Sequence, residues 1–378
     1  MKYFVRTVII GCLAVAAFTF WADPSHRWHR NLVFAYSNLG EGEAWVVPQA
    51  GYDERKLKTA HFKLAKRADV LVLGSSRAMQ ISTSFLQPGK TLFNLGVSGA
   101  SIEDYLAFWQ LAKEENKIPE YVLIYADPWI LNVKRDQNRW VSNKEYFESF
   151  LQGVQPQRRN FLELFQSRIR ELANEGADLL SWISLKAAWD FFQGWQMGEA
   201  VASEGGVLPE NKIPANKSAY LYDGSYRYPA KTIEPKASAA IRQIASEYYA
   251  GKSVYSLDQY ANDSEAMKQF KSLLTDLKAH AVKTMIILPP YQPETYRGIL
   301  AKPGYQTILP QFAAAMESLA VESSETHLCD QMDPTRAGCL GTEFFDGMHA
   351  LVSCERKVLA RCLGLHAEWA KLARGKTF

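Results

Sequence analysis

Short apolar runs alternate along the chain with segments whose apolar positions recur at helical spacing. The runs that read as strands are Val70–Leu73, Thr91–Val97, Tyr121–Tyr125 and Thr284–Leu288. The helical spacing covers residues 102–113, 264–280 and 305–320. Strands that are apolar throughout, with helices between them, are typical of a parallel sheet covered on both faces. The pattern therefore predicts an α/β fold with three layers, α/β/α, around a central parallel sheet.

Polar turns follow three of these strands. They are Gly74-Ser75-Ser76, the glycine-containing loop 94–99 and Ala126-Asp127-Pro128-Trp129. Ligands of such sheets bind at the carboxyl ends of the strands, where all three turns lie. We therefore expect the functional site at this edge of the sheet.

The region 136–260 breaks the alternation. It contains aromatic helical patterns between about residues 179 and 195, and a stretch at 203–236 that is rich in Gly, Pro, Asn and Lys. We predict a largely helical insertion that caps the sheet, with 203–236 as loop. Its aromatic side chains either pack as core or, because basic residues accompany them, face a membrane or a partner.

The first 22 residues form a basic start and an apolar run. Lys2 and Arg6 precede the run, which is short for a bilayer span. We predict an uncleaved anchor at 1–22. The alternatives are a cleaved signal peptide, with a poor cleavage site at 14–16, and lipidation at Cys12. Each of these exports the chain. Residues 23–65 are expected to be a tether and lead-in, and 66–378 the α/β domain.

Composition narrows the function classes. The chain has 378 residues, 47% of them hydrophobic, which suffices for a large core, and its net charge of +3 gives no basic field for nucleic acid. No P-loop, zinc-finger spacing or GxGxxG occurs, so no cofactor is expected.

Four cysteines lie in the last quarter of the chain, which agrees with an oxidising compartment: Cys329, Cys339, Cys354 and Cys362. Three pairings are possible. Cys354 and Cys362 are expected on one helix, too far apart to bridge each other, so their partners should come from 329–339. Buried free thiols are the alternative. His327 hints at a metal, but no further ligand stands at a suitable spacing, and we expect no metal site.

A serine, an acid and an imidazole follow one another in the order used by serine hydrolases. Ser76 follows a strand and is expected at a helix N-terminus, where backbone N–H groups can stabilise negative charge. Asp346 and His349 form an Asp-x-x-His turn before an amphipathic helix. In such a turn the carboxylate can orient the imidazole, which then takes the serine proton.

Together these segments resemble the SGNH (GDSL-like) hydrolase superfamily over most of 66–135 and 280–375. The resemblance implies Ser76 as nucleophile, Asp346 and His349 as its partners, and Gly99 as an oxyanion donor beside the Ser76 N–H. One departure stands out. The family's asparagine after the third strand is replaced by Ala126-Asp127-Pro128-Trp129, and Asn132 is the nearest substitute.

Four further residues are candidates for substrate contacts. Arg77 is either a solvated side chain or a contact for an anionic substrate or partner. Tyr125, Trp129 and Tyr291 lie near strand ends and are expected to floor a sugar site, with core packing as the alternative.

The Gly-Ser-Ser block, the anchor and the 289–293 turn look like a membrane-tethered branch that includes the D-alanyl transfer protein of teichoic acid modification and the alginate O-acetyltransferases. This resemblance implies an esterase or O-acyltransferase outside the bacterial inner membrane. It would act on an envelope glycopolymer beside a membrane-bound O-acyltransferase. The alternative is a catalytically weak or inactive binding or assembly protein with this fold.

Overall fold

The protein is described here from a computed structural model. The described residues are 2–22, 39–47, 52–132, 138–154, 206–234 and 265–373, with isolated positions between 185 and 261.

A five-stranded parallel sheet forms the centre of the molecule, in the order β3-β2-β4-β8-β9. Its strands are β2 (Val70–Leu73), β3 (Leu92–Asn94), β4 (Tyr121–Tyr125), β8 (Lys283–Leu288) and β9 (Thr326–Asp330). The four predicted strands are confirmed. The fifth, β9, was missed because it is a half-buried edge strand that mixes polar and apolar residues. The chain places β3 on one side of β2 and then returns to place β4 on the other, and ligands bind at such a switch point.

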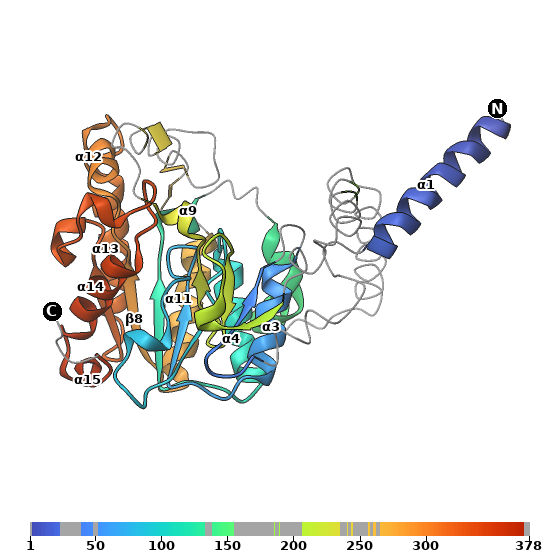
Figure 1. The fold of residues 1–378 in the computed structure, drawn as a ribbon. Coiled ribbons are helices and arrows are strands. Elements are labelled where there is room, and N and C mark those ends of the chain that lie inside the picture. Colours follow the sequence, from blue (N-terminus) through green and yellow to red (C-terminus); the bar gives the residue numbers. More distant parts are fainter. Residues whose placement is uncertain are drawn as a thin grey trace.

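Helices cover both faces of this sheet, as the strand pattern predicted. One face carries α3 (Glu54–Leu64), α4 (Ile102–Glu114), α11 (Glu265–Ala279) and α13 (Ile308–Ala320). The other carries α14 (Val352–Leu363) and α15 (Ala367–Ala370) (Figure 1). The side chains of β4 divide accordingly, with Val122 and Ile124 on the first side and Leu123 and Tyr125 on the second.

The remaining elements are shorter or lie outside the central layers. They are α1 (Lys2–Ala22), α5 (Lys144–Val154), α9 (Ala230–Ile233), α12 (Pro293–Ala301) and the 3-10 helices η1 (Thr83–Phe85), η2 (Pro128–Leu131), η3 (Arg139–Asn143), η4 (Glu210–Lys212), η6 (Pro334–Ala337) and η7 (Gly341–Glu343). No helix among the described residues combines the length and hydropathy that a bilayer span requires.

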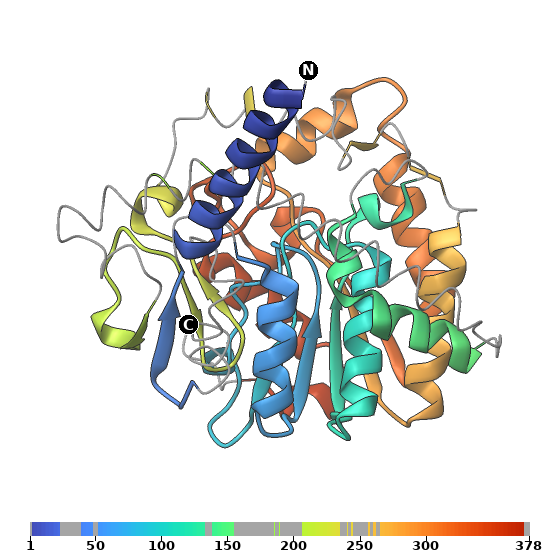
Figure 2. The same cartoon turned by 90° about the vertical axis from the view of Figure 1, so that its right-hand side faces the viewer.

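A second, antiparallel sheet corrects two predictions. Its order is β5-β1-β6-β7, formed by β1 (Glu43–Val46), β5 (Val207–Pro209), β6 (Ala219–Leu221) and β7 (Tyr226–Arg227). It lies beside α3 in Figure 2. β1 and α3 therefore belong to the folded body, and the prediction of a tether is wrong for these two elements. The prediction of loop for 203–236 is wrong for β5, β6 and β7, whose two or three residues are too few to show a strand period. The aromatic segment 179–195 lies almost wholly outside the described residues.

Two disulfides tie α14 to the rest of the domain. Cys329 of β9 pairs with Cys362, and Cys339 pairs with Cys354. This confirms that the two helical cysteines have their partners within 329–339, and the alternative of free thiols is wrong. Because α14 begins three residues after His349, these bonds also hold the segment that carries the imidazole.

Candidate active site

The three side chains predicted to act together do meet at the carboxyl end of the sheet. Ser76 Oγ lies 2.7 Å from His349 Nε2, and His349 Nδ1 lies 2.7 Å from Asp346 Oδ2. Ser76 follows β2 at the switch point, and the other two precede α14. These distances are those of hydrogen bonds between a nucleophile, a base and the group that orients the base.

The segment around His349 is built to hold the imidazole. Asp346 Oδ1 accepts the backbone N–H groups of Met348 and His349, both at 2.8 Å, which closes an Asx-type turn. The Phe345 ring stacks on the imidazole, with a centroid distance of 5.3 Å and an interplanar angle of 13°. The ring of His349 is therefore fixed at an edge by Asp346 and on one face by Phe345.

Asp346 is a carboxylate at neutral pH. Burial by itself raises its pKa, but the His349 charge and hydrogen bond, together with the two backbone donors, outweigh burial and lower the pKa to about 2. A charged Asp346 favours the tautomer that leaves Nε2 free to accept, and it stabilises the imidazolium that forms.

Ser76 lies in a tight turn and not at a helix N-terminus, so that expectation is wrong. The Ala78 N–H donates to the Ser75 carbonyl at 2.9 Å, and the next helical element is the short η1. Gly74 is required before this turn, because a Cβ there would lie 2.6 Å from the Ala78 side chain and 2.9 Å from that of Tyr125. Negative charge near Ser76 must therefore be stabilised by individual N–H groups.

The loop after β3 lies beside this turn. The Val97 N–H donates to the Gly74 carbonyl at 3.1 Å. Ser76 lies two residues after Gly74, and Gly99 lies two residues after Val97. Gly99 has φ +58°, a left-handed conformation that glycine adopts without a steric cost. Within the described residues, neither the Ser76 nor the Gly99 N–H donates a hydrogen bond. Two free donors thus lie on adjoining loops.

Arg77 is neither solvated nor exposed to a substrate, because it is only 2% exposed. Its guanidinium donates to Asp127 at 2.7 Å, to the Met348 carbonyl at 3.0 Å and to the Pro289 and Pro290 carbonyls at 2.9 and 2.5 Å. These acceptors follow β4 and β8 and precede His349. Arg77 therefore binds together the loops that form the site.

The three aromatic candidates are buried, so the prediction that they floor a sugar site is wrong. Tyr125 is fully buried with its hydroxyl 3.4 Å from Glu355, Tyr291 packs on the Arg77 guanidinium at 4.6 Å, and Trp129 is 6% exposed. The alternative of core packing is confirmed. Tyr125 is the last residue of β4, Trp129 lies in η2 and Tyr291 follows β8, and all three side chains are buried within the domain.

Asn132 is also fully buried, and its amide donates to the Ser256 carbonyl at 2.8 Å. This contact gives Asn132 a role in holding the segment around Ser256.

The sequence patterns did not single out several residues that contact the site. Asp127 accepts from both Ser75 Oγ and Arg77, and Tyr228 packs against Phe345 with ring centroids 5.0 Å apart. The Phe344-Phe345 pair beside Asp346 was the one available signal. Tyr228 comes from the segment predicted as loop, and no local pattern marks it.

Glu355 gives the site a pH-dependent neighbour. It is fully buried on α14, and burial raises its pKa to about 8, although the charge of Arg77 lowers it. The native state therefore keeps a proton that the unfolded chain releases near pH 4.5. We expect the free energy of unfolding to fall as pH rises from about 5 to 8. Glu355→Gln, which mimics the protonated acid, should flatten this slope in urea titrations; an unchanged slope would assign the titration to another group.

No group of three or more His, Cys, Asp or Glu residues in the described part of the chain is arranged to hold a metal ion. His327 instead contacts Glu368 at 2.8 Å and stacks on His366.

No protein-family model matches the sequence, and no curated protein is significantly similar to it. The functional conclusion therefore depends on the geometry of the site.

Proposed function

We propose that this protein is a serine esterase or O-acyltransferase that works through an acyl-serine intermediate. The observation that carries the proposal is the continuous chain of hydrogen bonds from Ser76 through His349 to Asp346. An unrelated surface serine has no reason to meet a carboxylate-bound imidazole from a segment 273 residues away. The same constellation serves acyl transfer on several folds.

The geometry supports a two-step reaction. His349 Nε2 takes the proton of Ser76 Oγ as the oxygen attacks an ester carbonyl, and the Ser76 and Gly99 N–H groups receive the oxyanion. The ester C–O bond then breaks, and His349 returns the proton to the leaving alcohol. An acceptor hydroxyl from water or a glycan then attacks the acyl-serine and gives its proton to His349. The bond between the acyl carbon and Ser76 Oγ breaks, His349 returns the proton to Oγ, and the acid or the new ester is released.

We also propose that the chain is an SGNH-type hydrolase. Support comes from the positions of its three motifs: Ser76 follows β2, Gly99 follows β3, and the Asp-x-x-His turn precedes the last long helix. A parallel sheet with helices on both faces is compatible with that family's three-layer fold.

The proposed location is outside the bacterial inner membrane. The two disulfides favour an oxidising compartment, and the basic, apolar N-terminus favours export. The proposed substrate is an envelope glycopolymer or an acyl donor for it, and the proposed partner is a membrane-bound O-acyltransferase. These assignments come from the resemblance of the sequence motifs.

A fluorophosphonate probe tests the proposal directly. It reacts with a serine that is activated by a base, so the wild-type protein should be labelled and Ser76→Ala should not. Ser75→Ala is the matched control, because Ser75 is the neighbouring hydroxyl but donates to Asp127. Equal labelling of wild type and Ser76→Ala would remove Ser76 from the mechanism.

One observation favours a second candidate, a weakly active or inactive binding protein. The Asn132 amide donates to the Ser256 carbonyl, so the nearest substitute for the family's asparagine is engaged with another segment. Losing one oxyanion donor costs about 10²–10³ in rate. If this candidate is right, polymer modification in cells should survive Ser76→Ala. Complete loss of modification in that variant would reject it.

A further inference from the structure

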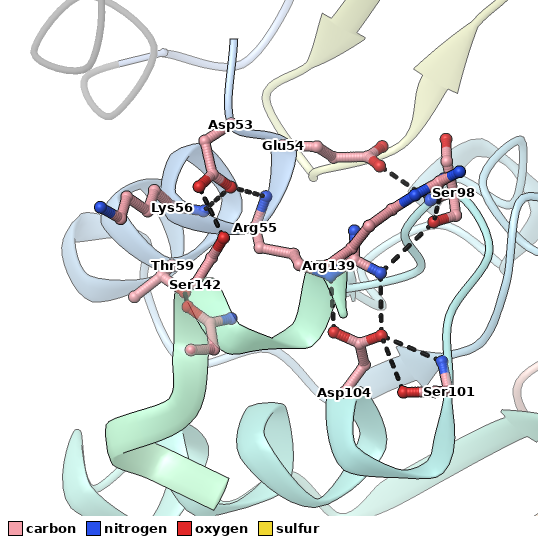
Figure 3. A network of polar contacts seen from close by, with 11 residues as sticks. Asp53, Glu54, Arg55, Lys56, Thr59, Ser98, Ser101, Asp104, Arg139 and Ser142 are labelled. Carbon is pink, nitrogen blue, oxygen red and sulfur yellow. Dashed lines mark hydrogen bonds and ion pairs between the residues drawn. The ribbon is translucent and has the colours of Figure 1, made fainter. Parts of the chain in front are cut away.

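The peptide bond between Ser98 and Gly99 is held on its carbonyl side by two arginines. Arg55 Nη2 and Arg139 Nη1 each donate to the Ser98 oxygen at 3.3 Å. Figure 3 shows the two guanidinium groups reaching Ser98 from separate elements, α3 and η3. The two guanidinium donors fill both lone pairs of the Ser98 carbonyl, so this oxygen is held from two directions by cations of two different elements.

Arg55 is itself rigidly placed. Its Nε and Nη2 bind the two oxygens of Asp104 at 2.7 and 2.8 Å, and both side chains are buried. Asp104 also accepts the Ser101 N–H at 3.0 Å, in the capping box that begins α4. The pair therefore fixes Arg55 relative to the helix that directly follows the Gly99 loop.

The same helix α3 holds the loop at further points. Glu54 Oε2 accepts the Ser98 N–H at 2.7 Å, and the Lys58 amine donates to the Asn94 carbonyl at 3.1 Å and to the Gly96 carbonyl. Both the N–H and the C=O of Ser98 are thus engaged by adjacent residues of α3. The next N–H along the chain, that of Gly99, has no acceptor in the described residues.

We propose that Arg55 and Arg139 are positioning residues that aim and polarise the Gly99 N–H as an oxyanion donor. A peptide unit is planar and trans, so fixing the Ser98 C=O fixes the opposite direction of the Gly99 N–H. Cationic donors next to the carbonyl oxygen polarise the amide and make its N–H a stronger hydrogen-bond donor. This assignment rests on the proposed acyl-transfer function. In it, the Gly99 N–H is held in place to bind the oxyanion of the transition state more strongly than the carbonyl of the substrate.

Arg139→Ala is the decisive variant, because Arg139 is exposed and its loss leaves the buried Arg55–Asp104 pair intact. With p-nitrophenyl acetate as substrate, we expect kcat to fall by about 3- to 10-fold at unchanged KM, a fraction of the effect of losing a whole oxyanion donor. The affinity for a phenylboronic acid, whose tetrahedral adduct carries the oxyanion, should fall by the same factor. Arg139→Lys should recover part of both, and the 15N shift of the Gly99 amide should move in Arg139→Ala.

Lys56→Ala is the matched control, because Lys56 is an exposed cation on α3, the helix of Arg55, and no hydrogen bond joins its side chain to the loop among the described residues. It should leave kcat, KM and boronate affinity unchanged. Wild-type activity in Arg139→Ala, or a change in KM alone, would overturn the positioning role while leaving the triad standing. Absence of Ser76-dependent labelling in the wild type would instead overturn the proposed function itself.

Discussion

Asp346→Asn is expected to lower kcat by about 10⁴-fold, the loss seen when a triad carboxylate becomes an amide and the imidazole takes the wrong tautomer. The asparagine oxygen can still accept the Met348 and His349 N–H groups that now bind Asp346 Oδ1. Its NH₂ would then face His349 Nδ1, which must become an acceptor and place its proton on Nε2. A protonated Nε2 cannot take the proton of Ser76.

The measurement is steady-state hydrolysis of p-nitrophenyl acetate, with thermal unfolding to establish that the variant is folded. Asp333→Asn is a matched control, because Asp333 closes a similar Asx-type turn by accepting the Thr335 N–H at 2.9 Å but takes no part in the triad. The control should retain wild-type kcat. A folded Asp346→Asn protein with a kcat within tenfold of wild type would contradict the assignment of Asp346.

Arg77→Ala is expected to reduce the free energy of unfolding by about 3–5 kcal/mol, the cost of removing one partner from a buried ion pair. Burial already raises the pKa of Asp127, and without the Arg77 charge this carboxyl would keep only Ser75 Oγ as a hydrogen-bond donor. Three backbone carbonyls would lose their donor. Activity should be lost with stability, because the Met348 carbonyl bound by Arg77 immediately precedes His349.

Urea unfolding followed by tryptophan fluorescence measures this effect, and two further variants locate its cause. Arg77→Lys keeps the charge but cannot reach four acceptors in a plane, so it should be intermediate. Arg297→Ala removes an exposed arginine and should change stability by less than about 0.5 kcal/mol. A stability of Arg77→Ala equal to that of Arg297→Ala would show that the buried network contributes nothing.

The loops that form the site are joined by buried side chains beneath them. Arg77 connects the segments after β2, β4 and β8 with the turn that carries His349, while α3 holds the loop of Gly99 from the side. Ser76, His349 and Gly99 are therefore placed by buried polar contacts and not by the strands alone. Such contacts are costly to leave half made, which favours a single arrangement of the loops.

The helix α3 shows why part of this was hidden in the sequence. Its eleven residues, Glu54–Leu64, carry six charged or histidine side chains, so the segment was predicted to be a tether. In the structure Arg55, Lys58 and His61 are buried. Arg55 and Lys58 are tolerated there because Asp104 and the carbonyls of Asn94 and Gly96 receive them. Apolar periodicity does not reveal a buried helix face whose side chains are cations with hydrogen-bond acceptors.

The burial of Arg77 was not predicted from the sequence for a similar reason. Its position after the serine suggested exposure, because a cation beside a helix N-terminus is disfavoured. No helix begins there, and three of its acceptors are backbone carbonyls. A carbonyl is present at every residue, so nothing in the sequence indicates which ones will meet a guanidinium.

By itself the sequence determined the parallel sheet, the long helices that cover it, the order of the triad and the helix that two cysteines share. These features follow from local periodicity and from residue types that have few chemical uses. Only the tertiary structure decided that β9 and the small antiparallel sheet complete the fold and that Tyr125, Trp129 and Tyr291 are core. It also decided that Arg55, Arg77 and Arg139 bind the loops around Ser76, Gly99 and His349. The physical reason is that these outcomes depend on which donors and acceptors from distant segments are buried together. Every residue has a backbone carbonyl, so the sequence does not indicate which carbonyls accept hydrogen bonds from buried side chains.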